Sequence, residues 1–293
     1  MQREETRTAL DAVPGGVVSL ALVVGLAVAL AAFVAPFFLH AVEVWSTDEE
    51  FSYGFLIPPT VIGMIWWRRA ALRRSAGRGA IAGLVIAVIA GLLMLLSRRI
   101  EIHVLGGLAV SPLLWGIAVY LWGWGAGRVL AFPLAFLVFG LGLYRGLLSS
   151  VGFALQTFTA ISAGWSGHLL GLHVVRDGLV LQSESFAFVV AQTCSGMNSL
   201  LSLLALAALW MYVTHGKMSA RAAVLLSVLP LVVVANTVRV TLVLFVATWL
   251  GQDAALGFFH GASSLVLFGM AVSGLLLVSR VVGCKFASFA SQY

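Results

Sequence analysis

The chain has 293 residues, of which 61% are hydrophobic and only 10% are charged, and its mean hydropathy is +1.06. Soluble domains have about 45–50% apolar and about 25% charged residues, so this composition excludes a water-soluble globular protein. The net charge of +6 does not indicate a nucleic-acid partner, because the Lys and Arg residues form short clusters between apolar runs. No linker separates two units, and residues 1–293 are predicted to form a single integral membrane domain.

Apolar runs long enough to cross a bilayer recur along the chain. A spanning helix needs about 20 mostly apolar residues, within a range of about 17–25. The predicted spans are residues 17–39, 53–67, 80–97, 104–124, 129–147, 195–213, 222–249 and 260–279. The first is too long for the core of a signal peptide, which has about 7–15 residues. Pro58 and Pro59 predict an irregular outer part of the second span, packed inside the protein.

Basic residues on alternate loops predict the orientation of these spans. They follow the second, fourth, sixth and eighth spans, and they are Arg68, Arg69, Arg73, Arg74, Arg78, Arg128, Lys217, Arg221, Arg280 and Lys285. With a cytoplasmic N-terminus, all four clusters lie on the cytoplasmic side, as the positive-inside rule requires. Arg98 and Arg99 oppose the rule on the outer side, beside Glu101 and His103.

Residues 149–174 are apolar enough to span the membrane but are rich in Ser, Thr and Gly. A full span here would move the later basic loops outside, so this segment is predicted to be interfacial or re-entrant. Residues 175–193 then form an outer loop, in which Asp177-Gly178 predicts the turn of a short hairpin. The predicted fold class is an all-α polytopic transmembrane bundle of about eight spans, with an outer hairpin or re-entrant segment before the sixth.

Cys194 begins the sixth span at its outer end. A helix N-terminus offers unpaired N–H groups and a positive dipole end, and both favour a thiolate. Ser195, Gly196 and Asn198 suit a capped helix start that could present donors to an oxyanion. The alternative is a small buried thiol without a chemical role, which is the commoner fate of a single cysteine. Cys284 follows the last span beside Lys285, on the cytoplasmic side, and is predicted to be dispensable.

Arg239 lies deep inside the seventh apolar run, 18 residues after the basic Arg221. At about 1.5 Å per residue, its Cα lies roughly 27 Å up a hydrocarbon core that is about 30 Å thick. An arginine inside a membrane marks a functional site by default, and the alternative is an arginine that snorkels to the outer headgroups. Asn236 lies three residues earlier on the same helix face and is expected to orient the guanidinium.

His260 begins the eighth span after a short outer turn, and so reaches the same membrane face. A thiol, an imidazole and a guanidinium on three elements suit acyl transfer through a thioester, with no metal or cofactor expected. The cysteine would attack a peptide carbonyl, the histidine would transfer the proton, and the arginine would stabilise the oxyanion or orient the substrate.

Several segments resemble the exosortase/archaeosortase family of membrane cysteine transpeptidases. They are 189–200 around Cys-Ser-Gly, 235–242 around Asn-Thr-Val-Arg-Val-Thr, His260-Gly261-Ala262-Ser263, the Gly-Phe-Leu-Ile-Pro-Pro region in 50–69, and the Arg-Asp-Gly region in 171–181. By position, the catalytic residues of the family correspond to Cys194, Arg239 and His260. The chain has Gln192 where many members have Glu, Asn198 where an Arg often follows, and Tyr53 where a His often precedes Gly-Phe-Leu.

The resemblance implies cleavage of C-terminal sorting signals, which consist of a short motif, one transmembrane helix and a basic tail. The motif is typically Pro-Glu-Pro in Gram-negative bacteria, often alongside exopolysaccharide genes. The implied partners are such sorting-signal proteins, membrane lipid and an acceptor nucleophile of unknown identity. The implied location is the bacterial inner membrane, with the catalytic part, residues 175–280, carrying its site at the periplasmic face.

Two other functions remain open from the residues alone. A small transporter or channel could line its path with Arg239 and His260. Such a path should be polar at several depths, whereas the sixth to eighth spans are nearly all apolar below their outer third. A non-enzymatic membrane assembly factor would not need the thiol of Cys194.

Overall fold

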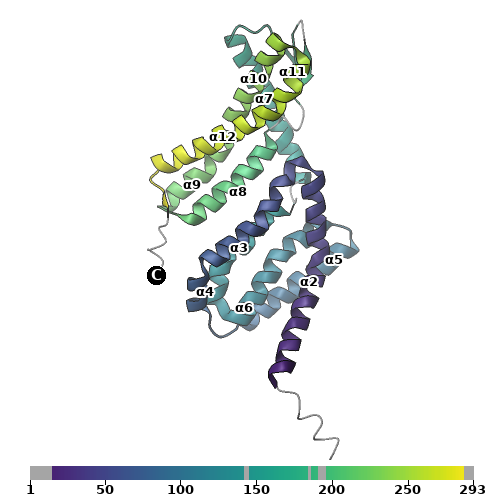
Figure 1. Ribbon diagram of the computed structural model, residues 1–293, viewed down its shortest axis with the longest axis vertical. Coiled ribbons are helices and arrows are strands. Elements are labelled where there is room, and N and C mark those ends of the chain that lie inside the picture. The colour runs from purple at the N-terminus through teal and green to yellow at the C-terminus, as the bar shows by residue number, and fades with distance from the viewer. Residues whose placement is uncertain (1–14, 142–144, 184–185, 191–195, 287–293) are drawn as a thin grey trace, which may run out of the picture.

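The computed structural model describes residues 15–141, 145–183, 186–190 and 196–286 of the chain (Figure 1). The helices are α2 (Gly15–Thr47), α3 (Ile57–Trp67), α4 (Arg69–Ser75), α5 (Ile81–Arg99), α6 (His103–Phe136), α7 (Arg145–Leu169), α8 (Met197–Val213), α9 (Met218–Leu226), α10 (Val228–Leu250), α11 (Gln252–Leu256) and α12 (Phe258–Val281), with 3-10 segments η1 (Glu49–Leu56) and η2 (Leu137–Gly140). The short strands are β1 (Val175–Asp177), β2 (Val180–Gln182), β3 (Ala187–Val189), β4 (Thr214–His215) and β5 (Lys285–Phe286). The predicted all-α class is therefore confirmed.

The apolar helices match the predicted membrane segments. Within the described residues, four helical stretches are long and apolar enough to cross a membrane, namely Leu22–Thr47, Ile81–Arg99, His103–Gly140 and Met218–Leu250. Shorter apolar helices cover Phe51–Trp67, Ser199–Val213 and Leu265–Val281. The chain is thus a multi-pass membrane protein, whereas its count of eight spans stays a prediction.

The longest of these stretches is a helical hairpin, which accounts for two predicted spans. Gly123 has φ 77° and ψ 179°, which breaks α6 into two halves. The halves run antiparallel, since a Cβ atom at Gly127 would meet Val119 close to the turn, whereas Ser111 and Ala135 line one pocket farther from it. The turn lies beside the loop after α4, where the amide of Gly77 donates to the carbonyl of Trp122.

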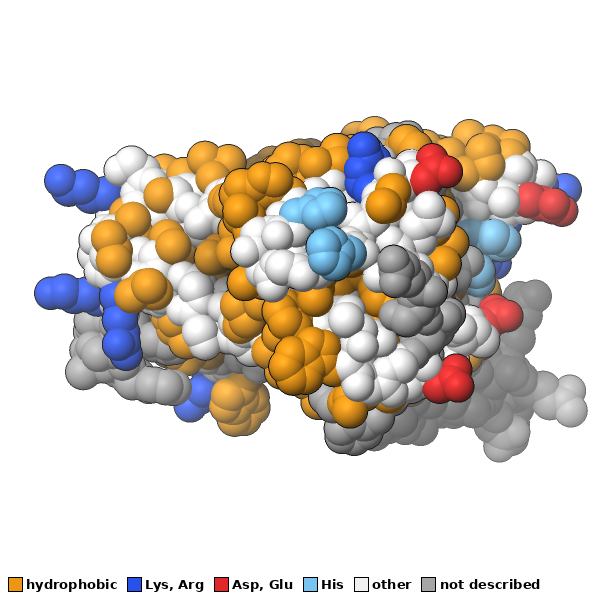
Figure 2. Space-filling model, turned by 90° about the horizontal axis from the view of Figure 1, so that it is seen from above, with side chains coloured by type: hydrophobic (Ala, Val, Ile, Leu, Met, Phe, Trp, Pro, Cys, Tyr) orange, Lys and Arg blue, Asp and Glu red, His pale blue; other side chains and the backbone are white. Residues whose placement is uncertain are grey.

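A two-stranded sheet joins the C-terminal ends of α8 and α12. Strand β4 pairs with β5, and His215 lies opposite Lys285 in this register. The basic loop after α4 thus lies beside the turn of α6, and the basic segment after α8 lies beside that after α12. The predicted orientation requires the two members of each pair to lie on the same side of the membrane. Figure 2 shows Lys and Arg side chains gathered at the left end of the molecule, where α4 and α9 lie in Figure 1, and acidic side chains toward the right.

The second predicted span is irregular at its outer part, as expected. It begins as the 3-10 segment η1, and Pro58 and Pro59 then occupy the first turn of α3. A proline costs no hydrogen bond at this position because the first amides of a helix lack intrahelical partners. Phe51 and Ile57 are buried, so this segment is packed inside the protein.

The segment before α8 differs in part from its prediction. Residues 145–169 form one continuous helix, α7, so the re-entrant alternative for 149–174 is wrong, because a re-entrant segment reverses its direction. The interfacial placement of this segment stays a prediction. The predicted hairpin follows, with Asp177 opposite Val180 and Gly178 at φ 59° in its turn.

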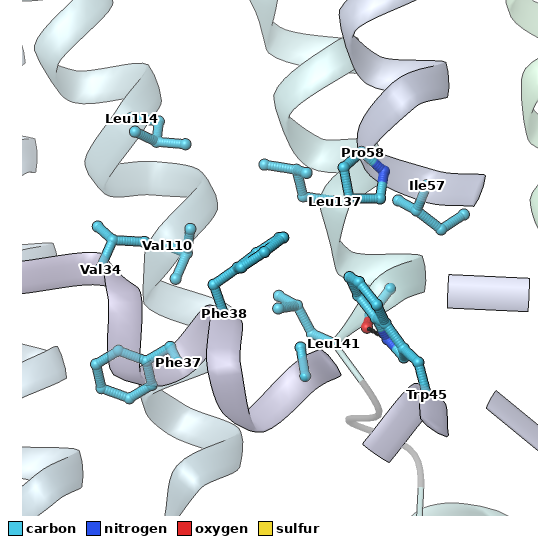
Figure 3. Close-up of a pocket in the computed structure, with 12 residues that line it drawn as sticks. Val34, Phe37, Phe38, Trp45, Ile57, Pro58, Val110, Leu114, Leu137 and Leu141 are labelled. Atoms are coloured by element: carbon cyan, nitrogen blue, oxygen red, sulfur yellow. Dashed lines mark hydrogen bonds between the residues drawn. The ribbon is translucent and has the colours of Figure 1, made fainter. Parts of the chain in front are cut away.

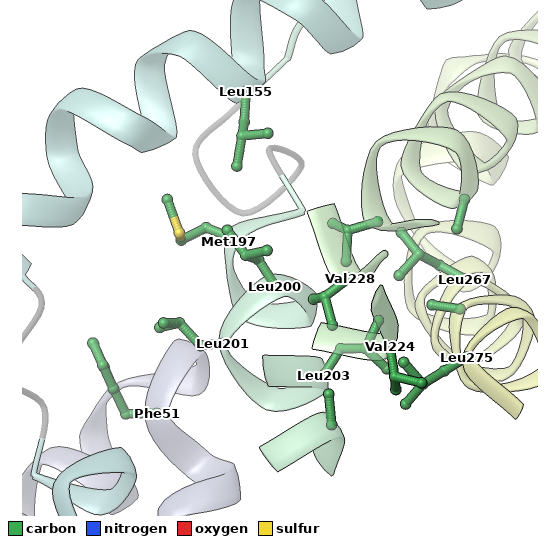
Figure 4. Packing of buried hydrophobic residues seen from close by; sticks show 14 of the residues in the cluster. Phe51, Leu155, Met197, Leu200, Leu201, Leu203, Val224, Val228, Leu267 and Leu275 are labelled. Atoms are coloured by element: carbon green, nitrogen blue, oxygen red, sulfur yellow. The ribbon is translucent and has the colours of Figure 1, made fainter. Parts of the chain in front are cut away.

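Helix α8 lies at the centre of the largest apolar cluster (Figure 4). Its residues Met197, Leu200 and Leu203 are buried among side chains of six other elements. These side chains include Trp45 of α2, Phe51 of η1, Leu155 of α7, Val224 of α9, Val228 of α10, and Leu267 and Leu275 of α12. The packing fixes the start of α8 relative to α7, α10 and α12, and this start directly follows Cys194 and Ser195 in the chain.

Helices α5 and α6 approach each other through glycines. A Cβ atom at Gly83 would overlap the backbone nitrogen of Tyr120, and one at Gly116 would lie 2.7 Å from the backbone nitrogen of Ala87. Small residues allow such close backbone packing in membranes, where the hydrophobic effect does not hold helices together. The two glycines are therefore required by the packing of this pair.

We predict that Gly83→Ala destabilises the protein by about 1–3 kcal/mol, the usual cost of overpacking a well-packed site. Gly91→Ala on the same helix is the control, since a Cβ atom there meets nothing within 4 Å. Thermal unfolding of both purified variants in one detergent measures the difference. Equal melting temperatures would contradict the proposed packing.

Candidate active site

The structure describes some of the predicted site residues and not others. Gln192, Cys194 and Ser195 lie outside the described residues, as do the side chains of Asn198 and His260. The backbones of Asn198 and His260 belong to the first turns of α8 and α12. Gly196, Asn236 and Arg239 are described in full, and the geometry of the site is built from them.

Arg239 is buried within the helix bundle. Its side chain is 6% exposed and that of Asn236 is 1% exposed. The guanidinium therefore lies inside protein, and the alternative that it snorkels to the headgroups is wrong. Arg239 follows Met218, the start of the apolar stretch, by 21 residues, or about 32 Å of helix. Its position near the outer end of the hydrocarbon core stays a prediction.

Helix α7 supplies hydrogen-bond partners to the same part of α10. Asn236 Nδ2 donates to Thr159 Oγ1 at 2.9 Å. Two further pairs follow along both helices, and they are Ser162 with Thr237 at 2.8 Å and Ser166 with Thr241 at 2.6 Å. The pairs advance in the same direction on both helices, so α7 and α10 run parallel here.

This polar seam was not predicted from the sequence. The hydroxyl residues of α7 recur at positions 159, 162 and 166, which is the spacing of one helix face. Thr237 and Thr241 repeat the spacing on α10, and this match is the signal that could have paired the two helices. Polar groups at membrane depth need partners inside the protein, and the seam provides them for α10.

Gly196 brings the start of α8 against Asn236. It is the N-cap of α8, with φ 80°, a left-handed conformation that glycine adopts without a steric cost. A Cβ atom at Gly196 would lie 3.2 Å from Cγ of Asn236 and 3.3 Å from Cγ1 of Val232. The Cys-Ser-Gly segment thus ends in direct packing contact with the polar turn of α10.

The hairpin before α8 is anchored on the same helix. Val190, which follows β3, is fully buried in a cluster with Val240, Val243 and Leu244 of α10. Its amide donates to the carbonyl of Leu179 at 2.9 Å. Val190 and Gly196 therefore both pack beside the turn of α10 that bears Asn236 and Arg239.

Cys284 lies at the opposite end of α8. Its thiol is free and partly buried, and a Cβ atom at Gly216 would lie 3.3 Å from its sulfur. Among the residues that the structure describes, no group of three or more His, Cys, Asp or Glu side chains could hold a metal ion. Among the described residues, the groups available for chemistry around Gly196 include the guanidinium of Arg239, the amide of Asn236 and the hydroxyls of the seam.

The helical bundle and its buried polar turn define a multi-pass membrane protein with a polar site at one end of its helices. A family model described as transmembrane exosortase matches residues 45–277, which include α8, α10 and the start of α12. The chain therefore belongs to the transmembrane exosortase family. No curated protein and no solved structure matches the chain.

We predict that Thr159→Val lowers the free energy of unfolding by about 1 kcal/mol, because Asn236 loses a buried acceptor and hydrogen bonds between membrane helices contribute on this scale. Thr157→Val is the matched control, since its hydroxyl bonds only within α7, to the carbonyl of Phe153. Thermal unfolding in detergent measures both variants. A loss of equal size in the two would show that the seam does not stabilise the polar turn.

Proposed function

We propose that this protein is a membrane cysteine protease and transpeptidase, which cleaves the C-terminal sorting signals of exported proteins through a thioester on Cys194. The observation that carries the proposal is the packing of Gly196, of the Cys-Ser-Gly segment, against the buried turn that holds Asn236 and Arg239. Membership of the transmembrane exosortase family supports it. The active site would lie at the periplasmic face of the bacterial inner membrane.

Chain connectivity keeps Cys194 close to this turn. Two residues of extended chain span at most about 7 Å, and Cys194 precedes Gly196 by two residues. Gly196 itself touches the side chain of Asn236, which lies one helical turn from Arg239. A thiol in this neighbourhood is within the range in which a long arginine side chain can act on its reaction.

The proposed reaction has two halves. In the first, the sulfur of Cys194 attacks the scissile carbonyl, and Arg239 stabilises the oxyanion, with backbone N–H groups around Ser195, Gly196 and Asn198 as further donors. His260 takes the thiol proton and gives it to the leaving amine, so the peptide C–N bond breaks and a thioester forms. In the second, an acceptor nucleophile attacks the thioester, releases the substrate protein and restores the thiol. Asn236 would orient the guanidinium, and Gln192 would support the site.

The height of the site matches the form of a sorting signal. A substrate helix of about 20 residues spans about 30 Å, with its basic tail on the cytoplasmic side. The motif before this helix then emerges about 30 Å above the cytoplasmic basic residues. Arg239 lies at about this height above Lys217, so motif and site would meet without withdrawal of the substrate from the membrane.

The alternative of a transporter is less well supported. Among the described residues of α8, α10 and α12, the buried polar side chains fall in two groups, with Asn236, Arg239 and Thr241 in the middle of α10 and Ser279 near the end of α12. Between them the core is apolar and includes Leu203, Val228 and Leu275. A solute path needs polar groups at several depths, whereas a catalytic site needs them at one.

We expect Cys194→Ala to abolish release of the C-terminal helix from a tagged sorting-signal protein, because the covalent step requires the thiol. Cys194→Ser should be nearly as inactive, since a hydroxyl is a far weaker nucleophile without an organised base. Cys284→Ser is the matched control and should process normally, because Cys284 lies at the other end of α8. The measurement is the size shift of the substrate in membranes with equal amounts of each variant.

Processing by Cys194→Ala at the wild-type rate would contradict the transpeptidase proposal. The transporter or the non-enzymatic assembly factor would then be the better account. Loss of processing in Cys284→Ser at a normal protein level would indicate that the reactive thiol is that of Cys284, at the opposite end of the bundle.

We also predict that Arg239→Lys does not restore activity. The planar guanidinium presents several donors in fixed directions, and an ammonium on a flexible stem does not reproduce them. Arg280→Lys, an exposed arginine at the other end of the bundle, should remain active. The same processing assay compares the two variants, and a fully active Arg239→Lys would reduce the role of Arg239 to that of a simple charge.

A further inference from the structure

The outer tip of α5 carries two arginines that the positive-inside rule does not explain. Arg98 and Arg99 are exposed, and no described carboxylate pairs with either of them. Arg98 lies against α2, where its Nη2 donates to the carbonyl of Phe33 at 2.6 Å. Its guanidinium also lies over two aromatic rings, 5.4 Å from the centre of Phe33 and 5.1 Å from that of Phe37.

Two histidines lie beside these arginines. The ring centres of His40 and His103 are 4.8 Å apart with the rings tilted by 33°, one helical turn beyond the contact of Arg98 with Phe37. Glu43 lies 3.6 Å from His40, on the side of His40 toward the end of α2. Phe33, Phe37 and His40 follow the spacing of one helix face, so Arg98 and the histidine pair share a face of α2.

An apolar cavity begins at the same phenylalanine. It measures about 170 Å³ and lies between α2, α3 and α6, and Phe37 is among its lining residues (Figure 3). Figure 3 shows Phe38, Leu137, Leu141 and Trp45 around it. Phe38 is 48% exposed, so the cavity reaches the lipid-facing surface of α2. Engineered apolar cavities of about 150 Å³ stay dry and accept a benzene-sized body, so this one is large enough for a segment of hydrocarbon chain.

We propose that this surface binds an anionic phospholipid, with its phosphate at Arg98 and part of one acyl chain in the cavity. The proposal does not depend on the chemistry of Cys194. The phosphate supplies the negative charge that Arg98 and Arg99 lack among the described residues. The acyl chain fills the cavity, which is apolar and is surrounded by the hydrocarbon of the bilayer.

The guanidinium of Arg98 is held in a position to bind a phosphate. The two aromatic rings and the carbonyl of Phe33 hold the guanidinium in place, and its remaining N–H groups are available at its exposed edge. Arginine binds phosphate through such paired, charge-assisted hydrogen bonds. The acyl chain fixes the position of the lipid more than it raises the affinity of the protein for it. Transfer of an alkyl chain from the bilayer to an apolar cavity gains only dispersion contacts.

A simpler role for the arginines is to offset the negative dipole end of α5. That role would stabilise the helix and would give no preference among lipids of different charge. The two accounts are therefore separated by binding measurements that compare phosphatidylglycerol with phosphatidylcholine of the same acyl chains.

The experiment is native mass spectrometry of the full-length protein in detergent, titrated with each of these lipids. We expect wild type to prefer phosphatidylglycerol, and Arg98→Gln to weaken its binding about tenfold, the order expected when a charge-assisted hydrogen bond to the phosphate is lost. Ala41→Leu, which fills the cavity from α2, should weaken binding of both lipids.

Arg69→Gln is the matched control. Arg69 is also exposed, lies 4.7 Å from the ring centre of Trp66 and donates to a carbonyl, but it is at the cytoplasmic end and lines no part of this cavity. It should bind phosphatidylglycerol as wild type does. Equal affinity of wild type for the two lipids, normal binding by Arg98→Gln, or equal losses in Arg98→Gln and Arg69→Gln would each overturn the proposal.

A second measurement covers the case in which Arg98→Gln does not fold. Phosphatidylglycerol should raise the melting temperature of the wild-type protein more than phosphatidylcholine does, because a ligand that binds only the folded state stabilises it. Arg98→Lys should retain part of this difference, since it keeps the charge but not the planar group. Equal stabilisation of the wild type by both lipids would again contradict the site.

Discussion

A bilayer provides no hydrogen-bond partners, and this constraint decides how the polar turn of α10 is built. Asn236 and Arg239 lie at membrane height within an otherwise apolar helix, so neighbouring helices must present polar or very small surfaces to them. Helix α7 presents Thr159 and its further hydroxyls, and α8 presents Gly196. The serine and threonine residues of α7 therefore serve as hydrogen-bond partners for the polar residues of α10.

The two ends of the bundle are built differently. At one end, β4 pairs with β5 and Trp210 donates to Ser279 at 2.7 Å, which ties α8 to α12. The cluster around α8 is closely packed and apolar. Beyond it, the polar turn of α10 is enclosed by α7 and by Gly196, and Val190 packs beside it. Val190 and Gly196 are thus two fixed points beside the turn that bears Arg239.

Local signals in the sequence predicted much of this arrangement. The lengths of the apolar runs predicted the helices, because they depend on neighbouring residues alone, whereas the position of Arg239 near the outer membrane face stays a prediction. The continuity of α7 was missed, since its hydroxyls look polar in the sequence, and their partners on α10 are 75 residues or more away. The cavity beside Phe37 depends on three helices and was equally invisible. The roles of Cys194 and His260 stay predictions, made from their residue types and from the family resemblance.

The central claim is that peptide cleavage passes through a thioester on Cys194 beside Arg239. A thioester is intercepted by hydroxylamine, which takes the place of the acceptor and leaves a hydroxamate on the new C-terminus of the substrate. The decisive measurement is the mass of that C-terminus after a tagged sorting-signal protein is processed in membranes that contain hydroxylamine. We expect a hydroxamate with the wild-type protein and no cleavage with Cys194→Ala. Cleavage by Cys194→Ala, or a wild-type product that carries only a free carboxylate at every hydroxylamine concentration, would contradict the account.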